Sequence, residues 1–555
     1  MNDNLFKVKC DNNSMELFVK PGTTLLEIID MLNLSGPYPF IAAYVNNVVK
    51  DLNYNIYENK NVKFIDILHF EGVRVYERTL YFMLYKAVRD LYPNSELNIL
   101  QSVSRGSYFE ISGVENSDKV ATDLKNRLAQ ISKLNMPILR DRIHYKEAEK
   151  IYADNKMYDK SRLLESSPSL YVTINMLGNV YGYFYGTLAP STGYVSLFDI
   201  EPFYNGFYLS APHREDPQHL LPFAGSSKYF DVMLRNKELL DVLNVPDVGS
   251  LNSLINSGQS KELIKIGEAF QEKNFAHLAD EVYQKCEEGV KVVLISGPSS
   301  SGKTTFSNRL NIQLKIFGLK PLILSMDNYF VDRDKTPLDA KGNHDYEVVE
   351  ALDIELFNDH LQRLIAGEEV EVPKYSFTEG HRKWDGTKFM LKSRGILIIE
   401  GIHALNPRLT ESVEKDKKYK IYVSPLTSIS LDNMSRINTT DIRLMRRIVR
   451  DSAFRNHSAL QTLKRWGSVR RGEEKNILPF QNNADTLFNT SLFFELPVLK
   501  LYVEPLLNAV SDLSEEYSEA NRLLNILSNI VAIEHKWIPS TSIIREFIGG
   551  SSFDY

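Results

Sequence analysis

The sequence predicts a multidomain α/β protein whose largest part is built on a parallel sheet. Residues 290–500 alternate short apolar segments with amphipathic ones, as the strands and covering helices of a parallel sheet do. A loop rich in glycine and serine, at 297–304, directly follows one of the apolar segments. The chain of 555 residues is too long for one ordinary domain, so we expect further domains before this one.

Composition limits the classes of protein that this chain can belong to. The hydrophobic fraction of 43% and the charged fraction of 25% are normal for a globular protein, and the net charge of −6 creates no global positive field for nucleic acid. With only Cys10 and Cys286 present, a disulfide framework and a zinc site with several thiolates are excluded. No signal peptide and no apolar run of the roughly 20 residues that a membrane span needs is visible. We therefore expect a cytoplasmic protein without a membrane partner.

The N-terminal half divides into two smaller units. Residues 1–66 read as two strands, a helix and two more strands, and this order in so short a segment predicts a β-grasp fold. Residues 67–225 predict an α+β domain, with a helix from about 79 to 91 and a hairpin over 98–111. The density of Tyr, Phe and Gly at 181–208 predicts short strands whose rings pack together.

Two helical segments flank the parallel-sheet unit. Residues 226–289 are helical by pattern and charged on their outer faces, so we expect a helical connector. Residues 501–555 predict a C-terminal helical segment followed by a tail.

The loop after the first apolar segment matches the phosphate-binding pattern GxxxxGK[ST]. It lies between a predicted strand at 292–295 and a predicted helix after 304, which is the context that the pattern requires. Backbone N–H groups of such a loop surround phosphate oxygens, and its lysine reaches the β- and γ-phosphates. We expect ATP to contact Gly297, Ser299, Ser300, Ser301, Gly302, Lys303, Thr304 and Thr305.

Two carboxylates follow predicted strands of the same sheet. Asp327 comes after the strand at 322–324, and Glu400 ends the strand at 395–399. Ligands of open α/β sheets bind at the carboxyl ends of the strands, so both side chains should face the γ-phosphate. We expect Mg²⁺ to be held by Thr304, Asp327 and Glu400, with Asp327 also placed to accept a hydrogen bond from an attacking hydroxyl.

Arginines are concentrated at 443–471, with few acidic residues among them. Arg446, Arg447 and Arg450 are three or four residues apart on a predicted helix, so some share one face. Guanidinium groups on a closing lid stabilise the charge of phosphoryl transfer, and we expect Arg446, Arg450 and Arg455 to do so. A solvated helix face is the alternative, and an RNA-binding patch would need interleaved aromatic side chains that this segment lacks.

The C-terminal half resembles the uridine kinase family, which is related to phosphoribulokinase. No Asn-Lys-x-Asp guanine-binding motif follows the loop, so a GTPase is disfavoured. The resemblance rests on GPSSSGKTT (297–305), SMDNYF (325–330), PKYSF (373–377), IIEGIHAL (398–405) and RLMRRIVRD (443–451). It implies that Asp327 activates the 5′-hydroxyl of a nucleoside. The further substrate contacts that it implies are Tyr375, Phe377 and His381 for the pyrimidine, Asp345 for the ribose, and Arg447 on the lid helix.

Some positions depart from the pattern of this family. Ser376 stands where the family has Asp or Asn, and the segment around Asp345 lacks a His-Pro pair. Phosphoryl transfer is unaffected by these changes, but the preference between uridine and cytidine is left open.

The N-terminal half resembles parts of threonyl-tRNA synthetases. Residues 1–66 are similar to their TGS domain, and 67–225 to their second domain, through RTLYFMLYKAVRDLYP (78–93), SVSRGSYFEI (102–111) and YGTLAPSTGYVSLFDI (185–200). The editing chemistry of that domain uses His and Cys, which this segment lacks at the corresponding places, so it is not carried over. RNA is a candidate partner of these two domains.

Together these observations predict a kinase that uses ATP and Mg²⁺ to phosphorylate uridine or cytidine. A kinase for another small sugar-like alcohol, as in phosphoribulokinase, is the alternative within the same class. A nucleotide-dependent regulator associated with RNA or the ribosome is the alternative from a different class. We also expect a homo-oligomer.

Overall fold

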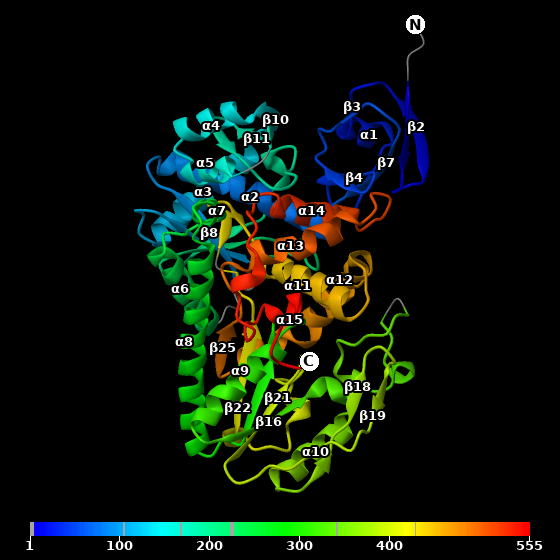
Figure 1. Ribbon diagram of the computed structural model, residues 1–555. Coiled ribbons are helices and arrows are strands. Elements are labelled where there is room, and N and C mark those ends of the chain that lie inside the picture. The colour runs from blue at the N-terminus through cyan, green and yellow to red at the C-terminus, as the bar shows by residue number, and fades with distance from the viewer. Residues whose placement is uncertain are drawn as a thin grey trace.

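The structure is a computed structural model that describes residues 5–103, 106–166, 169–222, 227–339, 342–427 and 429–554. Two N-terminal units lie at one end of the molecule and a parallel-sheet unit lies at the other (Figure 1). The C-terminal helices turn back and lie between these two ends. The predicted multidomain α/β architecture with a parallel sheet is confirmed.

The N-terminal unit is a mixed sheet with one helix. Its elements are β1 (Phe6–Cys10), β2 (Met15–Val19), β3 (Thr23–Thr24), α1 (Leu25–Met31), β4 (Ala42–Val45), β5 (Val48–Lys50), β6 (Asn55–Ile56) and β7 (Lys60–Ile65). The strand order is β2-β1-β7-β4-β5, in which β1 and β7 pair in parallel and the other neighbours pair antiparallel. Helix α1 begins where Thr24 and Glu27 cap each other's backbone N–H, which satisfies two donors that a helix start leaves open.

The second unit packs two antiparallel sheets against a long helix. Its elements are α2 (Phe70–Leu91), β8 (Leu97–Val103), β9 (Gly106–Ile111), α3 (Asp118–Lys133), β10 (Ile138–His144), α4 (Tyr145–Asp154), α5 (Tyr158–Glu165), β11 (Tyr171–Leu177), β12 (Val180–Gly182), β13 (Asp199–Phe203) and β14 (Gly206–Ser210). The sheet orders are β13-β14-β9-β8 and β10-β11-β12. The predicted hairpin is present as β8 and β9, and its turn at 104–105 lies outside the described residues. The aromatic segment packs as expected, with the rings of Phe109 and Phe207 stacked 5.3 Å apart.

Helix α2 begins well before the predicted start at residue 79. His69 caps it, and its first turns carry the charged residues Glu71 and Arg74. Because charged residues interrupt the apolar periodicity of these turns, the sequence pattern did not predict them as helical. In the fold they are satisfied by pairing, because Arg74 contacts Glu71 and lies 2.8 Å from Glu519.

Three helices connect the second unit to the parallel sheet: α6 (Ser227–Val242), α7 (Val248–Asn256) and α8 (Ser260–Glu287). The predicted boundary at 225–226 lies outside the described residues. Helix α8 is more than a connector, because its buried Phe275 ring packs 5.3 Å from Phe306 and 4.6 Å from Phe488. It therefore covers one face of the parallel sheet, along the left-hand side in Figure 1.

The parallel-sheet unit has five parallel strands in the order β16-β21-β15-β22-β25. These strands are β15 (Val292–Ser296), β16 (Lys320–Ser325), β21 (Gly395–Glu400), β22 (Lys418–Ser424) and β25 (Thr486–Asn489). The helices of this unit are α9 (Lys303–Ile316), α10 (Ile354–Ile365), α11 (Thr439–Phe454), α12 (Ala459–Asn476) and α13 (Glu495–Asn508). Its small hairpins are β17 (Val370–Glu371) with β20 (Lys388–Phe389), β18 (Lys374–Ser376) with β19 (His381–Lys383), and β23 (Ser430–Asp432) with β24 (Ser435–Arg436).

The C-terminal segment continues the parallel-sheet unit. Helix α13 runs across the predicted boundary at residue 500, so this boundary is wrong: the chain stays helical there and its apolar face is buried. After it come α14 (Tyr517–Leu527) and the short α15 (Arg545–Ile548). The tail is packed, since Ile543 and Phe547 are 0% exposed.

The second unit is attached to the parallel-sheet unit by buried charges. Lys160 on α5 lies 2.9 Å from Asp432 in the β23–β24 hairpin, and the two side chains are 2% and 0% exposed. The backbone N–H of Ile99 on β8 donates to the carbonyl of Asn433 in the same hairpin, at 2.8 Å. The hairpin leads directly into α11, so the second unit supports the helix that carries the arginines.

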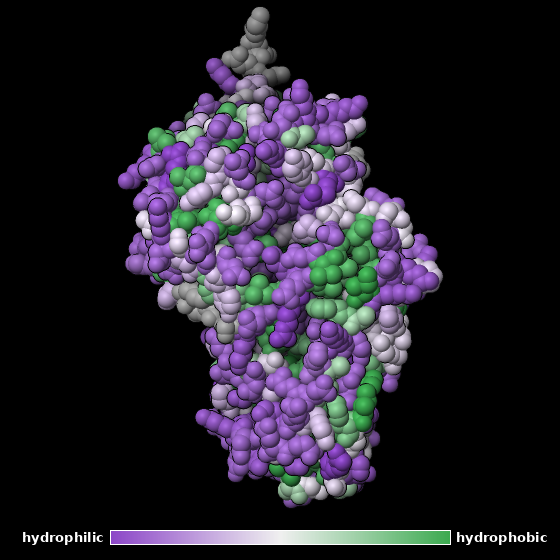
Figure 2. All heavy atoms as spheres, turned by 90° about the vertical axis from the view of Figure 1, so that its left-hand side faces the viewer, coloured by the Kyte–Doolittle hydropathy of each residue, from purple (hydrophilic) through white to green (hydrophobic). Residues whose placement is uncertain are grey.

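Two features concern the helices and the surface of the described residues. None of their helices combines the length and the apolar character needed to cross a membrane. The face that includes α6 and α8 is mostly hydrophilic, with smaller hydrophobic patches (Figure 2).

Candidate active site

The glycine-rich loop lies between β15 and α9, as its pattern predicts. Ser300 and Gly302 have φ values of 62° and 86°, so the backbone turns through the left-handed region just before the helix begins. A Cβ on Gly297 would lie 2.1 Å from the carbonyl oxygen of Val423 on β22. Only glycine fits there, so the loop is pressed closely onto the end of the sheet.

The loop presents polar groups that suit an anion. Lys303 Nζ donates to the carbonyl oxygens of Gly297 and Pro298, at 3.0 and 3.2 Å, so the lysine is folded back over the loop. Burial lowers the pKa of Lys303, because the charged form loses its solvent. Within the described part of the chain, the buried hydroxyls of Ser300 and Ser301 have no hydrogen-bond partner. Such groups fit the polyphosphate of a nucleotide, which can accept hydrogen bonds from all of them.

The two predicted carboxylates lie on neighbouring strand ends. Ser325 pairs with Glu400 in the register of β16 and β21, and its Oγ donates to Glu400 Oε1 at 2.6 Å. Asp327 follows on the turn after β16. Burial, with the nearby charge of Asp327, raises the pKa of Glu400 to about 7. Two neighbouring carboxylates repel each other when both are charged, and a divalent cation between them would relieve this repulsion.

The described residues contain no group of three or more His, Cys, Asp or Glu side chains that could hold a metal by themselves. Mg²⁺ is usually bound through one or two carboxylates together with substrate phosphates. Thr304, in the first turn of α9, is the residue whose hydroxyl would complete the set.

Helix α11 lies against the loop through its arginines. Arg443 Nε donates to the Ser299 carbonyl at 2.9 Å, and an Nη atom of Arg447 donates to the Ser299 hydroxyl at 2.8 Å. Arg443 was part of the arginine-rich segment but was not predicted to contact the loop. The sequence feature that could have identified it is its spacing of four residues from Arg447, which places both side chains on one face of the helix.

Arg446 occupies a different environment from the lid position that was predicted. It is 0% exposed, contacts Glu495 and donates to the carbonyl of Thr490 at 3.0 Å. It also reaches the Ser300 carbonyl at 3.5 Å. Its neighbours identify it as a buried support of the loop. The reason is helical phase: Arg446 lies between the loop backbone and the buried Glu495, whereas Arg447 contacts the Ser299 hydroxyl.

Aromatic rings gather beyond Asp327. Phe330, on the same turn, lies 5.6 Å from Tyr375, 6.1 Å from Phe377 and 5.9 Å from Tyr346. The guanidinium of Arg455 lies 4.8 Å from the centre of the Phe377 ring. Phe330 and Tyr346 were not predicted as site residues, although Phe330 closes the SMDNYF segment and Tyr346 follows Asp345.

The remaining predicted residues have local partners of their own. Asp345 is half-buried and its carboxylate accepts from the backbone N–H of Glu347 at 3.0 Å. His381 is exposed on β19 and lies 3.4 Å from Glu379, which is outside the ring cluster. Arg450 donates to Asp451 at 2.7 Å on α11.

The comparisons with known proteins agree with this geometry. A profile described as "Phosphoribulokinase / Uridine kinase family" matches residues 292–492. A uridine kinase from Vibrio atlanticus is 30% identical over 200 residues, which cover 35% of this chain and 85% of the relative. The chain belongs to the phosphoribulokinase and uridine kinase family. The protein is therefore a phosphotransferase by family, and its N-terminal half lies outside the matched region.

Two further similarities are to uridine kinases or possible uridine kinases. A uridine kinase from Halobacterium salinarum is 26% identical over 194 residues, covering 35% of this chain and 77% of the relative. A solved structure described as a "Possible Uridine Kinase" from Bacillus stearothermophilus covers 36% of this chain and 89% of its own, at 19% identity and a TM-score of 0.26.

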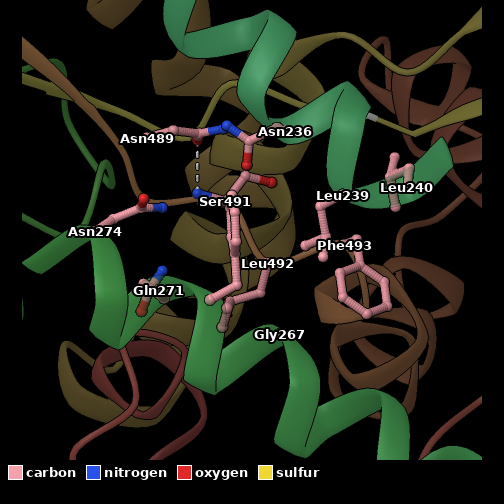
Figure 3. Close-up of a pocket in the computed structure, with 11 residues that line it drawn as sticks. Asn236, Leu239, Leu240, Gly267, Gln271, Asn274, Asn489, Ser491, Leu492 and Phe493 are labelled. Carbon is pink, nitrogen blue, oxygen red and sulfur yellow. Dashed lines mark hydrogen bonds between the residues drawn. The ribbon is translucent and has the colours of Figure 1, made fainter. Parts of the chain in front are cut away.

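A small cavity of this kinase lies where α6 and α8 approach the end of β25 (Figure 3). Its volume is about 10 Å³, room for about one water. Asn236 and Gln271 line it, and Asn489 Oδ1 accepts from the backbone N–H of Ser491 at 2.8 Å. It is too small to hold a substrate of this kinase.

Replacing Arg446 separates its supporting role from the predicted catalytic one. We expect Arg446→Met to lower the free energy of unfolding by about 3–5 kcal/mol, because Glu495 is left buried without its partner. Arg446→Met combined with Glu495→Gln should regain most of the loss in chemical denaturation. Arg471→Met, at an exposed position of α12, is the matched control. Unchanged stability of Arg446→Met with a large loss of turnover would instead place Arg446 at the reacting phosphate.

Proposed function

We propose that this kinase transfers the γ-phosphoryl group of ATP to the 5′-hydroxyl of uridine or cytidine. The observation that carries the proposal is the position of Asp327 between two sites. On one side it directly follows β16, whose last residue Ser325 pairs with Glu400, and on the other its own turn leads into the ring cluster at Phe330. A carboxylate between a polyphosphate site and an aromatic pocket can meet a hydroxyl whose base is stacked on the rings.

The residues would divide the work in the following way. Lys303 and the loop amides hold the β- and γ-phosphates, while Thr304 and Glu400 hold Mg²⁺, which neutralises phosphate charge when bound. Asp327 accepts the proton of the attacking hydroxyl and lies beside the same cation. Arg447, Arg450 and Arg455 stabilise the charge that develops on the transferred group.

The acceptor would be held by the residues beyond Asp327. Tyr375 and Phe377 stack the pyrimidine, Asp345 accepts from the ribose hydroxyls, and His381 turns inward from β19 to meet the base. Burial raises the pKa of Tyr375, and its buried hydroxyl has no hydrogen-bond partner among the described residues, so it is suited to bind a polar group of the base.

We infer that residues 1–66 are a TGS-type β-grasp module and that 67–225 follow the second domain of threonyl-tRNA synthetase. The mixed five-stranded sheet with one helix supports the first inference. A cytoplasmic location and self-association belong to the same proposal.

A panel of acceptors tests the proposal. Release of ADP is measured by a coupled assay with ATP and Mg²⁺. The value of kcat/KM should be at least about tenfold higher for uridine or cytidine than for purine nucleosides or ribulose 5-phosphate. A preference for the sugar phosphate would favour the phosphoribulokinase-like alternative. No turnover with any acceptor, together with RNA retention that responds to ATP, would favour the regulator.

A further inference from the structure

The C-terminal segment lies directly on the phosphate loop. A Cβ on Gly302 would come within 2.8 Å of Ile543 Cγ2, and the guanidinium of Arg446 lies 4.9 Å from the centre of the Phe547 ring. Ile543 and Phe547 are both fully buried. A segment that lies far from the loop in sequence therefore forms one of its walls.

Between these two apolar residues, Glu546 points at the start of α9. Its Oε2 accepts from the backbone N–H of Thr305 at 3.1 Å and from the Thr305 hydroxyl at 2.8 Å. The charge of the same carboxylate raises the pKa of Glu400 and opposes the lowering of the pKa of Lys303 by burial. It is therefore a negative charge inside the phosphate site, bound to a helix N-terminus as an anion would be.

Thr305 directly follows the phosphate-binding pattern, in the first turn of α9, and the amides of this loop and helix start are where the α- and β-phosphates of a nucleotide are expected. A carboxylate and a phosphate cannot both occupy the position that this amide and hydroxyl define, and their charges repel each other. We propose that Glu546 is an intramolecular competitor that takes the place of a nucleotide phosphate at Thr305. The inference rests on the proposed function, in which this loop binds ATP.

The segment around Glu546 is held at separate points. Ser542 Oγ donates to Glu268 on α8 at 2.5 Å, and an Nη atom of Arg545 donates to the Ile538 carbonyl at 2.8 Å. These contacts do not involve the loop, so they can remain while the carboxylate swings away. The carboxylate then returns when the nucleotide leaves, which weakens binding of ATP and ADP alike and favours product release.

Titration of the full chain with ADP tests the inference. We expect Glu546→Gln and Glu546→Ala to bind ADP at least about tenfold more tightly than the wild type, since each removes a charged competitor. Glu534→Gln, at an exposed ion pair with Lys536, is the matched control and should bind as the wild type does. Unchanged or weaker binding by both variants, in proteins whose thermal unfolding is unaltered, would overturn the inference.

Two results separate this inference from the proposed function. Wild-type binding of ADP without tighter binding by the variants overturns only the competitor. Absence of ADP binding in all proteins overturns the nucleotide site and the competitor together.

Discussion

Asp327→Asn is expected to reduce turnover of the preferred nucleoside by about a hundred- to thousandfold while nucleotide binding is retained. An amide keeps the size of the side chain but cannot accept the proton of the attacking hydroxyl. The loop that holds the phosphates does not include Asp327, so the dissociation constant for ADP in the absence of Mg²⁺ should change little. Steady-state release of ADP gives the first quantity, and calorimetric titration gives the second.

A nearby carboxylate provides the control for this variant. Asp334 is exposed on the segment that follows Phe330, and Asp334→Asn should turn over as the wild type does. If Asp327→Asn retained normal turnover, Asp327 would lose its role as the base and the site would need another acceptor for the proton.

Lys160→Met is expected to lower the free energy of unfolding by about 3–5 kcal/mol, because Asp432 is left without its partner in a buried place. The loss should grow as the pH rises. Burial already raises the pKa of Asp432 against the pull of Lys160, and without the lysine the neutral form is favoured further. Below that pKa the neutral carboxyl escapes the penalty, and above it the charged form carries the full cost. Denaturation at pH 5 and pH 8 measures the difference.

The paired replacement shows whether the interaction itself is responsible. Lys160→Met combined with Asp432→Asn should recover most of the stability, since the two paired charges are removed together and the backbone N–H of Met434 keeps an acceptor. Lys150→Met, at an exposed position of α4, should be neutral. A loss that persists in the pair would mean that packing, and not charge, joins the two units.

The same contact changes how the N-terminal half can be studied. Removing residues 1–225 would take away Lys160 and Arg74 and expose the hairpin that leads into α11. We therefore expect loss of turnover on deletion to reflect an unsupported α11. Point variants in the interface are the sharper test of whether the N-terminal units regulate the kinase.

The features that local sequence predicted are those whose chemistry is contained in a few adjacent residues. The loop at 297–304 needs glycine at fixed places and a lysine at its end, so its pattern was enough to predict a strand, a loop and a helix. Asp327 and Glu400 were placed because parallel strands end at one edge of the sheet, and the register of Ser325 with Glu400 agrees with that.

Other features depended on partners that are distant in sequence. In the early turns of α2, Arg74 pairs with Glu519, and the buried Arg446 pairs with Glu495. The covering role of α8 appears only when Phe275 meets the sheet. In each case the pattern of one segment was ambiguous, because a charged or apolar side chain can be either exposed or buried, and its distant partner decides which.

The sequence by itself determined the phosphate loop, the carboxylates at the strand ends, the parallel sheet and the family, since each follows from residue types at short spacing. The tertiary structure alone decided which arginines face the loop, which rings gather beside Asp327 and which carboxylate lies at Thr305. The physical reason is that burial and charge pairing act between segments that the chain brings together only when it folds.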